Sequence, residues 1–281
     1  MVRRTVGLAV VAVSLSMVGA HLTAQIAPKN APAAKASAVA KPASQPASAT
    51  PLPRMAITMV QIKPELINEW QEFQKNDVIP TLRKAGVAER TAVATVFGES
   101  FEYVFLTPVK SLAERDGDSP IVKALGREGA RAFGEKNRRF IAQQRTYVAT
   151  VRTDLSYQPT PMASLPVVVV SNFSIAPGRN AEFESYVKND LTPAHKQMKT
   201  GGFIVHQALF GGDGSSFVIA TLVPNFAELE KGPAITRAYG QARAAAIQQK
   251  LAGIVTHVER TVVRVVPDLS FQASRATSDN R

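Results

Sequence analysis

The chain contains no cysteine among its 281 residues, and it has only four histidines and one tryptophan. Without cysteine it cannot form disulfides, iron–sulfur clusters, thiolate metal sites or a cysteine nucleophile. The usual motifs of phosphate loops, dinucleotide sites, serine hydrolases and zinc proteases are also missing. The sequence therefore predicts no metal site and no cofactor, and it indicates architecture more clearly than it indicates a reaction.

Charge is modest, since 20% of the residues are charged and 45% are hydrophobic. This balance is typical of a globular protein and excludes a disordered, collagen-like or coiled-coil chain. The net charge of +11 falls to about +6 once the first 53 residues are set aside. A surplus of this size, without a recognisable binding module, predicts no nucleic-acid partner.

The longest hydrophobic run lies at the N-terminus. Arg3 and Arg4 precede the apolar stretch 6–18, which leads into small residues. This order is typical of a secretory signal peptide, predicted over residues 1–24, and the run is shorter than the roughly 20 residues that span a bilayer. We therefore expect a periplasmic or secreted protein with no transmembrane segment in the mature chain; an uncleaved anchor is the alternative.

Residues 25–53 are rich in alanine, proline, serine and lysine and contain no aromatic residue. Such a segment cannot build a core, so we predict a disordered linker there and a short disordered tail at 274–281. The densest basic cluster lies on an expected helix over 120–144, interleaved with glutamates. It predicts a solvated helix face, with contact to an anionic envelope surface as the alternative.

The rest of the chain is an internal duplication. Residues of the first copy recur in the second at an offset of 113 and, after one extra residue, of 114. At the first offset, seven residues of the first copy recur unchanged in the second: Ile62, Pro64, Glu69, Lys75, Asn76, Asp77 and Pro80. The segments 154–158 and 268–272, each Asp-Leu-Ser-aromatic-Gln, are expected to reach across to the other copy's sheet. The copies are predicted to span 54–160 and 161–273.

Each copy shows the same succession of strand and helix patterns. A β-rich stretch, 55–62 or 167–175, ends at a proline turn and is followed by apolar residues at helical spacing. A hairpin, a second helix and a closing strand complete the order β-α-β-β-α-β, the ferredoxin-like unit of an α+β protein. One such unit leaves a sheet face bare, so we predict two tandem repeats packed sheet to sheet as an intrachain pseudo-dimeric α+β barrel.

The second copy also carries a family resemblance. Its run IAPGRNAEFESY from Ile175, the later GGF at 201–203 and FAELE at 226–230 resemble the NIPSNAP branch of the dimeric α+β barrel superfamily. That superfamily also contains antibiotic-biosynthesis monooxygenases, EthD-like proteins and haem-degrading enzymes. The resemblance implies the fold, with activities that range from cofactor-independent oxygenation to small-ligand binding. The Asn, Trp and His set of the haem-degrading members cannot be assembled around Trp70, so haem breakdown is not predicted.

Strand alternation gives a candidate ligand site. If Phe173 and Ile175 face their helices, the side chains that alternate with them along the strand point into the barrel. These polar side chains, with their equivalent in the first copy, are Asn172, Ser174 and Gln61. They would orient the polar head of a small molecule, or they only hydrogen-bond each other. His206, on an expected strand, is a further ligand-binding candidate or a packed histidine.

Two aspartates are the candidate catalytic residues. At about 100° per residue, Asp77 falls on the buried stripe of the first helix, and Asp190 repeats the arrangement. A buried carboxylate must be hydrogen-bonded, paired or protonated, and a raised pKa would suit a general base. The structural alternative is that each aspartate caps backbone near Pro80 or Pro193, or pairs with a Lys or Arg of the second helix.

These observations predict a protein that binds a small molecule or a partner without established catalysis. The alternatives are a cofactor-independent monooxygenase or isomerase acting on a small organic substrate, and a non-catalytic module associated with the envelope. A cavity with convergent polar groups inside the barrel favours the first two, and a filled barrel favours the third.

Overall fold

The structure, a computed structural model, describes residues 51–272. The predicted leader 1–24, residues 25–50 of the predicted linker and the predicted tail 274–281 lie outside this range. Within the described range, no helix has both the length and the apolar character needed to cross a membrane.

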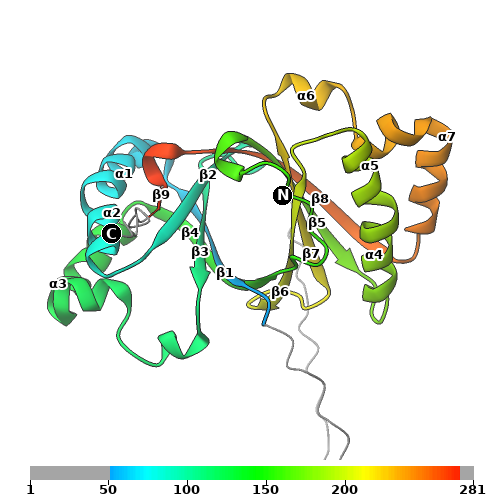
Figure 1. Ribbon diagram of the computed structural model, residues 1–281. Coiled ribbons are helices and arrows are strands. Elements are labelled where there is room, and N and C mark those ends of the chain that lie inside the picture. The colour runs from blue at the N-terminus through cyan, green and yellow to red at the C-terminus, as the bar shows by residue number, and fades with distance from the viewer. Residues whose placement is uncertain (1–50, 273–281) are drawn as a thin grey trace, which may run out of the picture. The chain divides into compact units, whose positions relative to one another are not determined.

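The described chain folds as two successive β-α-β-β-α-β units (Figure 1). The first contains β1 (Arg54–Ile62), α1 (Ile67–Phe73), α2 (Ile79–Lys84), β2 (Glu89–Phe97), β3 (Glu102–Val109), α3 (Pro120–Arg138) and β4 (Ile141–Val151). The second contains β5 (Val167–Ile175), α4 (Asn180–Tyr186), α5 (Thr192–Gln197), β6 (Phe203–Phe210), β7 (Ser216–Val223), α6 (Ala227–Glu230), α7 (Ala234–Lys250) and β8 (Val255–Val265). A short last strand, β9, covers Phe271–Gln272.

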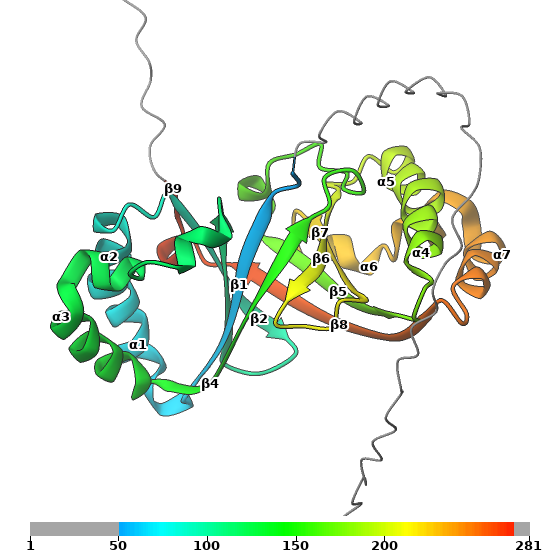
Figure 2. The ribbon, with the colours of Figure 1, turned by 90° about the horizontal axis from the view of Figure 1, so that it is seen from below.

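The eight longer strands form one closed antiparallel sheet. Within each unit the strand order is ferredoxin-like, β2-β3-β1-β4 and β6-β7-β5-β8. The units join edge to edge because β4 pairs with β6 and β8 pairs with β2. Figure 1 looks into the resulting ring, and Figure 2 shows the helices of each unit covering the outer face of its own half of the sheet. The predicted pseudo-dimeric α+β barrel of two ferredoxin-like repeats is confirmed.

Alternation along each strand separates a helix-facing side from a barrel-facing side. In β5, Phe173 packs on Phe183 of α4 with ring centroids 5.1 Å apart. Val168 belongs instead to an apolar cluster that draws residues from strands of both units. Because successive side chains of a strand point to opposite faces, Asn172 and Ser174 share the barrel side with Val168.

Each unit completes the core of the other with its closing segment. After β4 the chain pairs with β6 through Tyr157 and Phe203, and the buried Leu155 joins the core of the second unit. After β8 the chain forms β9, which pairs with β2, and the buried Leu269 joins the core of the first unit. The expectation that the two Asp-Leu-Ser-aromatic-Gln segments reach across to the other half is confirmed.

The serine of each exchanged segment makes the same hydrogen bond. Val205 N–H donates to Ser156 Oγ and Ala92 N–H donates to Ser270 Oγ, each at 2.9 Å. Both bonds satisfy a backbone donor of a strand in the opposite unit. The exchange therefore combines apolar burial with paired backbone groups, and either segment is costly to displace.

Shortening either exchanged leucine should destabilise the whole barrel. We expect Leu155→Ala and Leu269→Ala each to lower the free energy of unfolding by about 2–5 kcal/mol, because each leaves a cavity in a sealed core. The control is Leu125→Ala, because Leu125 is an exposed residue with a relative accessibility of 36%. Urea denaturation measures all three variants, and a loss at Leu269 no larger than at Leu125 would contradict the exchanged core.

Candidate functional site

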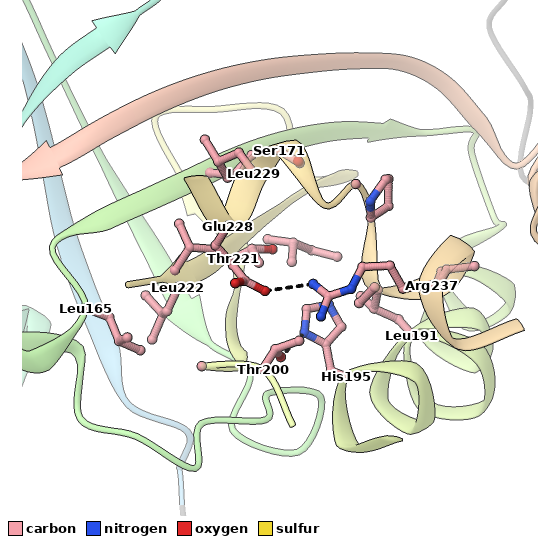
Figure 3. A pocket seen from close by; sticks show the side chains of 18 of the residues that line it. Leu165, Ser171, Leu191, His195, Thr200, Thr221, Leu222, Glu228, Leu229 and Arg237 are labelled. Carbon is pink, nitrogen blue, oxygen red and sulfur yellow. Dashed lines mark hydrogen bonds and ion pairs between the residues drawn. The ribbon is translucent and has the colours of Figure 1, made fainter. Parts of the chain in front are cut away.

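A cavity of about 670 Å³ lies in the second unit, between its helices and the outer face of its half of the sheet (Figure 3). Ser171 of β5 and Ile219 of β7 belong to its floor, and α5, α6 and α7 supply its walls. Leucines such as Leu191 and Leu229 make much of the lining apolar. The cavity thus lies on the opposite side of the sheet from the barrel interior.

His195 of α5 is the most deeply buried ionisable group of the cavity wall, with only 4% of the residue exposed. Its Nδ1 lies 2.7 Å from Thr200 Oγ1, and its ring stands edge-on to Phe203. Burial, with a contribution from the nearby positive charge of Arg237, lowers the pKa of His195 to about 4. The imidazole is therefore neutral at neutral pH.

An ion pair joins two helices at the cavity. Arg237 Nη1 of α7 donates to Glu228 Oε1 of α6 at 2.8 Å, and Lys231 Nζ donates to Glu228 Oε2 at 2.6 Å. The hydrogen bonds from Lys231 and Arg237 lower the pKa of the Glu228 carboxyl. Figure 3 shows Arg237 reaching toward Glu228, with the ring of His195 close to the guanidinium.

The corresponding layer of the first unit carries larger side chains at three positions. At the offset of 114, three isoleucines of the second unit match three phenylalanines of the first: Ile219, Ile247 and Ile254 match Phe105, Phe133 and Phe140. The guanidinium of Arg90 also lies 3.6 Å from the centroid of the Phe105 ring and donates to Gln74 at 2.8 Å. The two repeats therefore share a fold but differ in how this layer is packed.

Asp77 does not lie in the buried stripe where helical spacing predicts it. It falls in a π-helical turn, Gln74–Val78, whose extra residue brings Phe73 and Val78, five apart, to the buried side. The Asp77 side chain is 43% exposed and pairs with Lys136 at 3.1 Å. The expected burial is wrong because 100° per residue does not hold through a π turn, and a lysine of the second helix meets the carboxylate, as in the structural alternative.

Asp190 occupies the matching π turn, Val187–Leu191. Its side chain is 17% exposed and lies 4.0 Å from Lys250 of α7, the counterpart of Lys136. The next residue, Leu191, lines the cavity, so Asp190 is adjacent to the cavity wall. Desolvation, with a contribution from the charge of Asp190, raises the pKa of the half-buried Tyr186. The catalytic role of the two aspartates stays a prediction.

The four residues expected to bind a ligand lie on the barrel side of the sheet. Gln61 and His206 flank residues that pack against the helices, as do Asn172 and Ser174, so all four point away from the cavity. His206 is 5% exposed, and burial lowers its pKa to about 4. The alternation argument placed Gln61, Asn172 and Ser174 on the correct face, and the binding role of all four residues stays a prediction.

Sequence reasoning assigned no role to His195, Arg237 or Glu228. The available signal was the difference between the repeats, since phenylalanine positions of the first copy carry isoleucine in the second. Residues 51–272 contain no group of three or more histidine, aspartate and glutamate side chains that could hold a metal ion.

Comparison with known proteins identifies the fold. No protein-family model and no curated protein matches the chain. A protein from Lactobacillus acidophilus NCFM, proposed to be a monooxygenase, aligns with a TM-score of 0.51 and 9% identity over 79% of this chain and 96% of its own. A protein from Fusobacterium nucleatum, also proposed to be a monooxygenase, aligns with a TM-score of 0.51 and 8% identity over 76% of this chain and 93% of its own.

An anthrone oxidase-like protein aligns with a TM-score of 0.54 and 13% identity, over 79% of this chain and 94% of its own. At such identities the likeness shows the fold alone. That fold is the dimeric α+β barrel, as predicted from the sequence.

The two buried neutral histidines predict a loss of stability in mild acid. Both His195 and His206 have a pKa of about 4 in the folded protein, whereas an unfolded histidine titrates near 6.5. Between these values the unfolded chain binds protons that the folded chain does not. The contribution of the two histidines to the free energy of unfolding is therefore fully present above about pH 6.5 and is lost as the pH drops toward 4. We expect a loss of roughly 2 kcal/mol per histidine at pH 5.

Urea midpoints between pH 5 and pH 7.5 measure this effect. His195→Leu and His206→Val copy Leu82 and Val93 of the first repeat, and the double variant should lose most of the slope. The control His257→Gln removes an exposed histidine and should keep it. An unchanged slope in the double variant would show that the buried histidines are not its source.

Proposed function

We propose that the protein binds a small organic molecule in the cavity of the second unit. The observation that carries this proposal is the meeting of an apolar space of about 670 Å³ with the polar groups of His195, Ser171 and Arg237. Small-molecule sites have this volume range, and they combine an apolar lining with a few convergent polar groups.

The contrast between the repeats supports the proposal. At the cavity floor the second unit carries Ile219, where the first unit carries the larger Phe105 with Arg90 stacked on its ring. A cavity lowers stability, because its walls lose packing contacts. A role in binding accounts for the smaller side chain of Ile219 at a position where the same fold accepts phenylalanine.

Cofactor-independent oxygenation of the bound molecule is the second candidate. The aligned proteins include two proposed monooxygenases and an anthrone oxidase-like protein. In such a reaction the substrate itself supplies the carbanion, and a carboxylate or amide of the protein steers it. Asp190, beside the cavity wall, is then the first residue to test, with oxygen uptake in the presence of ligand as the measurement and Asp77→Asn as the matched control.

We also propose export, to the periplasm or beyond the cell, on the strength of residues 1–24 alone. The mature protein is expected to begin between His21 and Pro28 and to leave cells on osmotic shock. N-terminal sequencing of the released protein checks the cleavage. Intact leader in washed membranes would point to an anchor instead, and with it to the envelope-associated alternative.

The test of the binding proposal is titration with N-phenyl-1-naphthylamine, a neutral aromatic probe that fluoresces in apolar surroundings. We expect saturable binding at one probe per chain. Ile219→Phe gives the cavity floor the side chain of Phe105 and should weaken binding at least about tenfold, because the ring occupies ligand space.

The matched control is Ile247→Phe, which copies Phe133 at a position outside the cavity lining. It makes the same chemical change in the same layer and should leave the affinity within about twofold. Thermal melts establish that both variants are folded. Unaltered probe binding in a folded Ile219→Phe protein would overturn the cavity as the binding site.

A further inference from the structure

We infer that the ligand of this cavity is an organic anion, an apolar body that ends in a carboxylate or a comparable oxyanion. The inference rests on the proposed function and adds the chemical class of the ligand.

The hydrogen bonds around His195 place a donor at the cavity. Thr200 Oγ1 accepts a bond from Gly202 N–H at 3.2 Å and lies 2.7 Å from His195 Nδ1. The nearest acceptor for the threonine proton is Nδ1, so we assign the ring proton to Nε2. Among residues 51–272, the buried side-chain polar atom left without a partner is Asn180 Oδ1. His195 Nε2 is not among such buried atoms and has no hydrogen-bond partner among the described residues, so it reaches the surface of the cavity. Its N–H can therefore donate to an acceptor on a ligand.

The cavity has no free carboxylate to offer a cation. Glu228 supplies the one carboxylate among the described lining residues. Its Oε1 accepts from Arg237 and its Oε2 accepts from Lys231. An ammonium or amidinium ligand would therefore meet a neutralised acid and a neutral histidine, and it would gain no compensating charge.

Two further cations line the same cavity. Lys199 and Arg260 form no ion pair within the described part of the chain, and Arg237 is matched by Glu228 alone. Lys199 and Arg260 are both exposed, so they lie where the cavity meets solvent, and their positive charge attracts an anion to its mouth. Ser171 and Thr221 add hydroxyl groups that can donate to the same oxyanion.

The backbone at Lys199 supports a role for its charge. Lys199 has a φ of 48°, in the left-handed region that favours glycine, and its counterpart Gly86 has a φ of 80°. The second repeat thus carries a lysine at a helix end where the first carries the residue that the conformation prefers. Packing gives no reason for this choice, because Lys199 is exposed, whereas a charge needed at the cavity rim does.

Two probes with one aromatic skeleton test the inference on the mature protein. N-phenyl-1-naphthylamine is neutral, and 8-anilinonaphthalene-1-sulfonate adds a sulfonate to the same rings. At pH 7.5 and low salt we expect the sulfonate probe to bind about tenfold more tightly, an advantage that shrinks in high salt. Decanoate should displace it, whereas decan-1-ol and decylamine should displace it far less.

The variant Lys199→Gly with Arg260→Thr copies Gly86 and Thr146 of the first repeat. It should reduce the sulfonate preference to within about twofold while the neutral probe binds as before. The control, Lys196→Gln with Arg243→Gln, removes two exposed cations of α5 and α7 that do not line the cavity, and it should keep the preference.

Each outcome separates this inference from the proposed function. If both probes bind with equal affinity and both lose that affinity in Ile219→Phe, the cavity is a binding site but the inference of an anionic ligand is overturned. A sulfonate preference that survives in Lys199→Gly with Arg260→Thr places the anion elsewhere and also overturns the inference. Failure of both probes to bind overturns the proposed function and this inference together.

Discussion

Strand pairing between the two units is the constraint on which the rest of the structure depends. A ferredoxin-like half-sheet has two free edges and one bare face, and both features promote association. Pairing of β4 with β6 and of β8 with β2 removes the edges, and ring closure covers the face. Because Leu155 and Leu269 each complete the core of the opposite unit, neither core is whole without the other.

Closure of the sheet also determines where a ligand site can form. β5 and β7 pair with each other, and each has a further partner strand, so the cavity floor at Ser171 and Ile219 is held rigid. The walls come from helices, which the sheet does not constrain in the same way. The Glu228–Arg237 pair provides that constraint by tying α6 to α7 at the cavity. Rigid strands with a polar tie between helices give the preorganised geometry that a binding site needs.

The sequence predicted the architecture because the duplication repeats both periodicities, two in the strands and 3.6 in the helices, over more than a hundred residues. It misplaced Asp77 because a π turn changes the spacing without any signature in residue type. It missed the cavity for another reason. An open space depends on the summed volumes of residues distant in the chain, such as His195 and Ile219, and no single position marks it. Comparing the copies, Ile219 against Phe105, is the route by which the sequence alone could reveal it.

The duplication explains how one chain can tolerate this cavity. In the first unit Arg90 stacks on Phe105 and donates to Gln74, although a buried guanidinium without an ion pair among residues 51–272 is itself costly. In the second unit the counterparts of Arg90 and Phe105 are Phe203 and Ile219, and the space remains open. Because the core of each unit contains a leucine from the closing segment of the other, unfolding of one unit disrupts the other. The packing of the first unit therefore offsets the packing that the second unit lacks, and the chain can hold a cavity in one of its repeats.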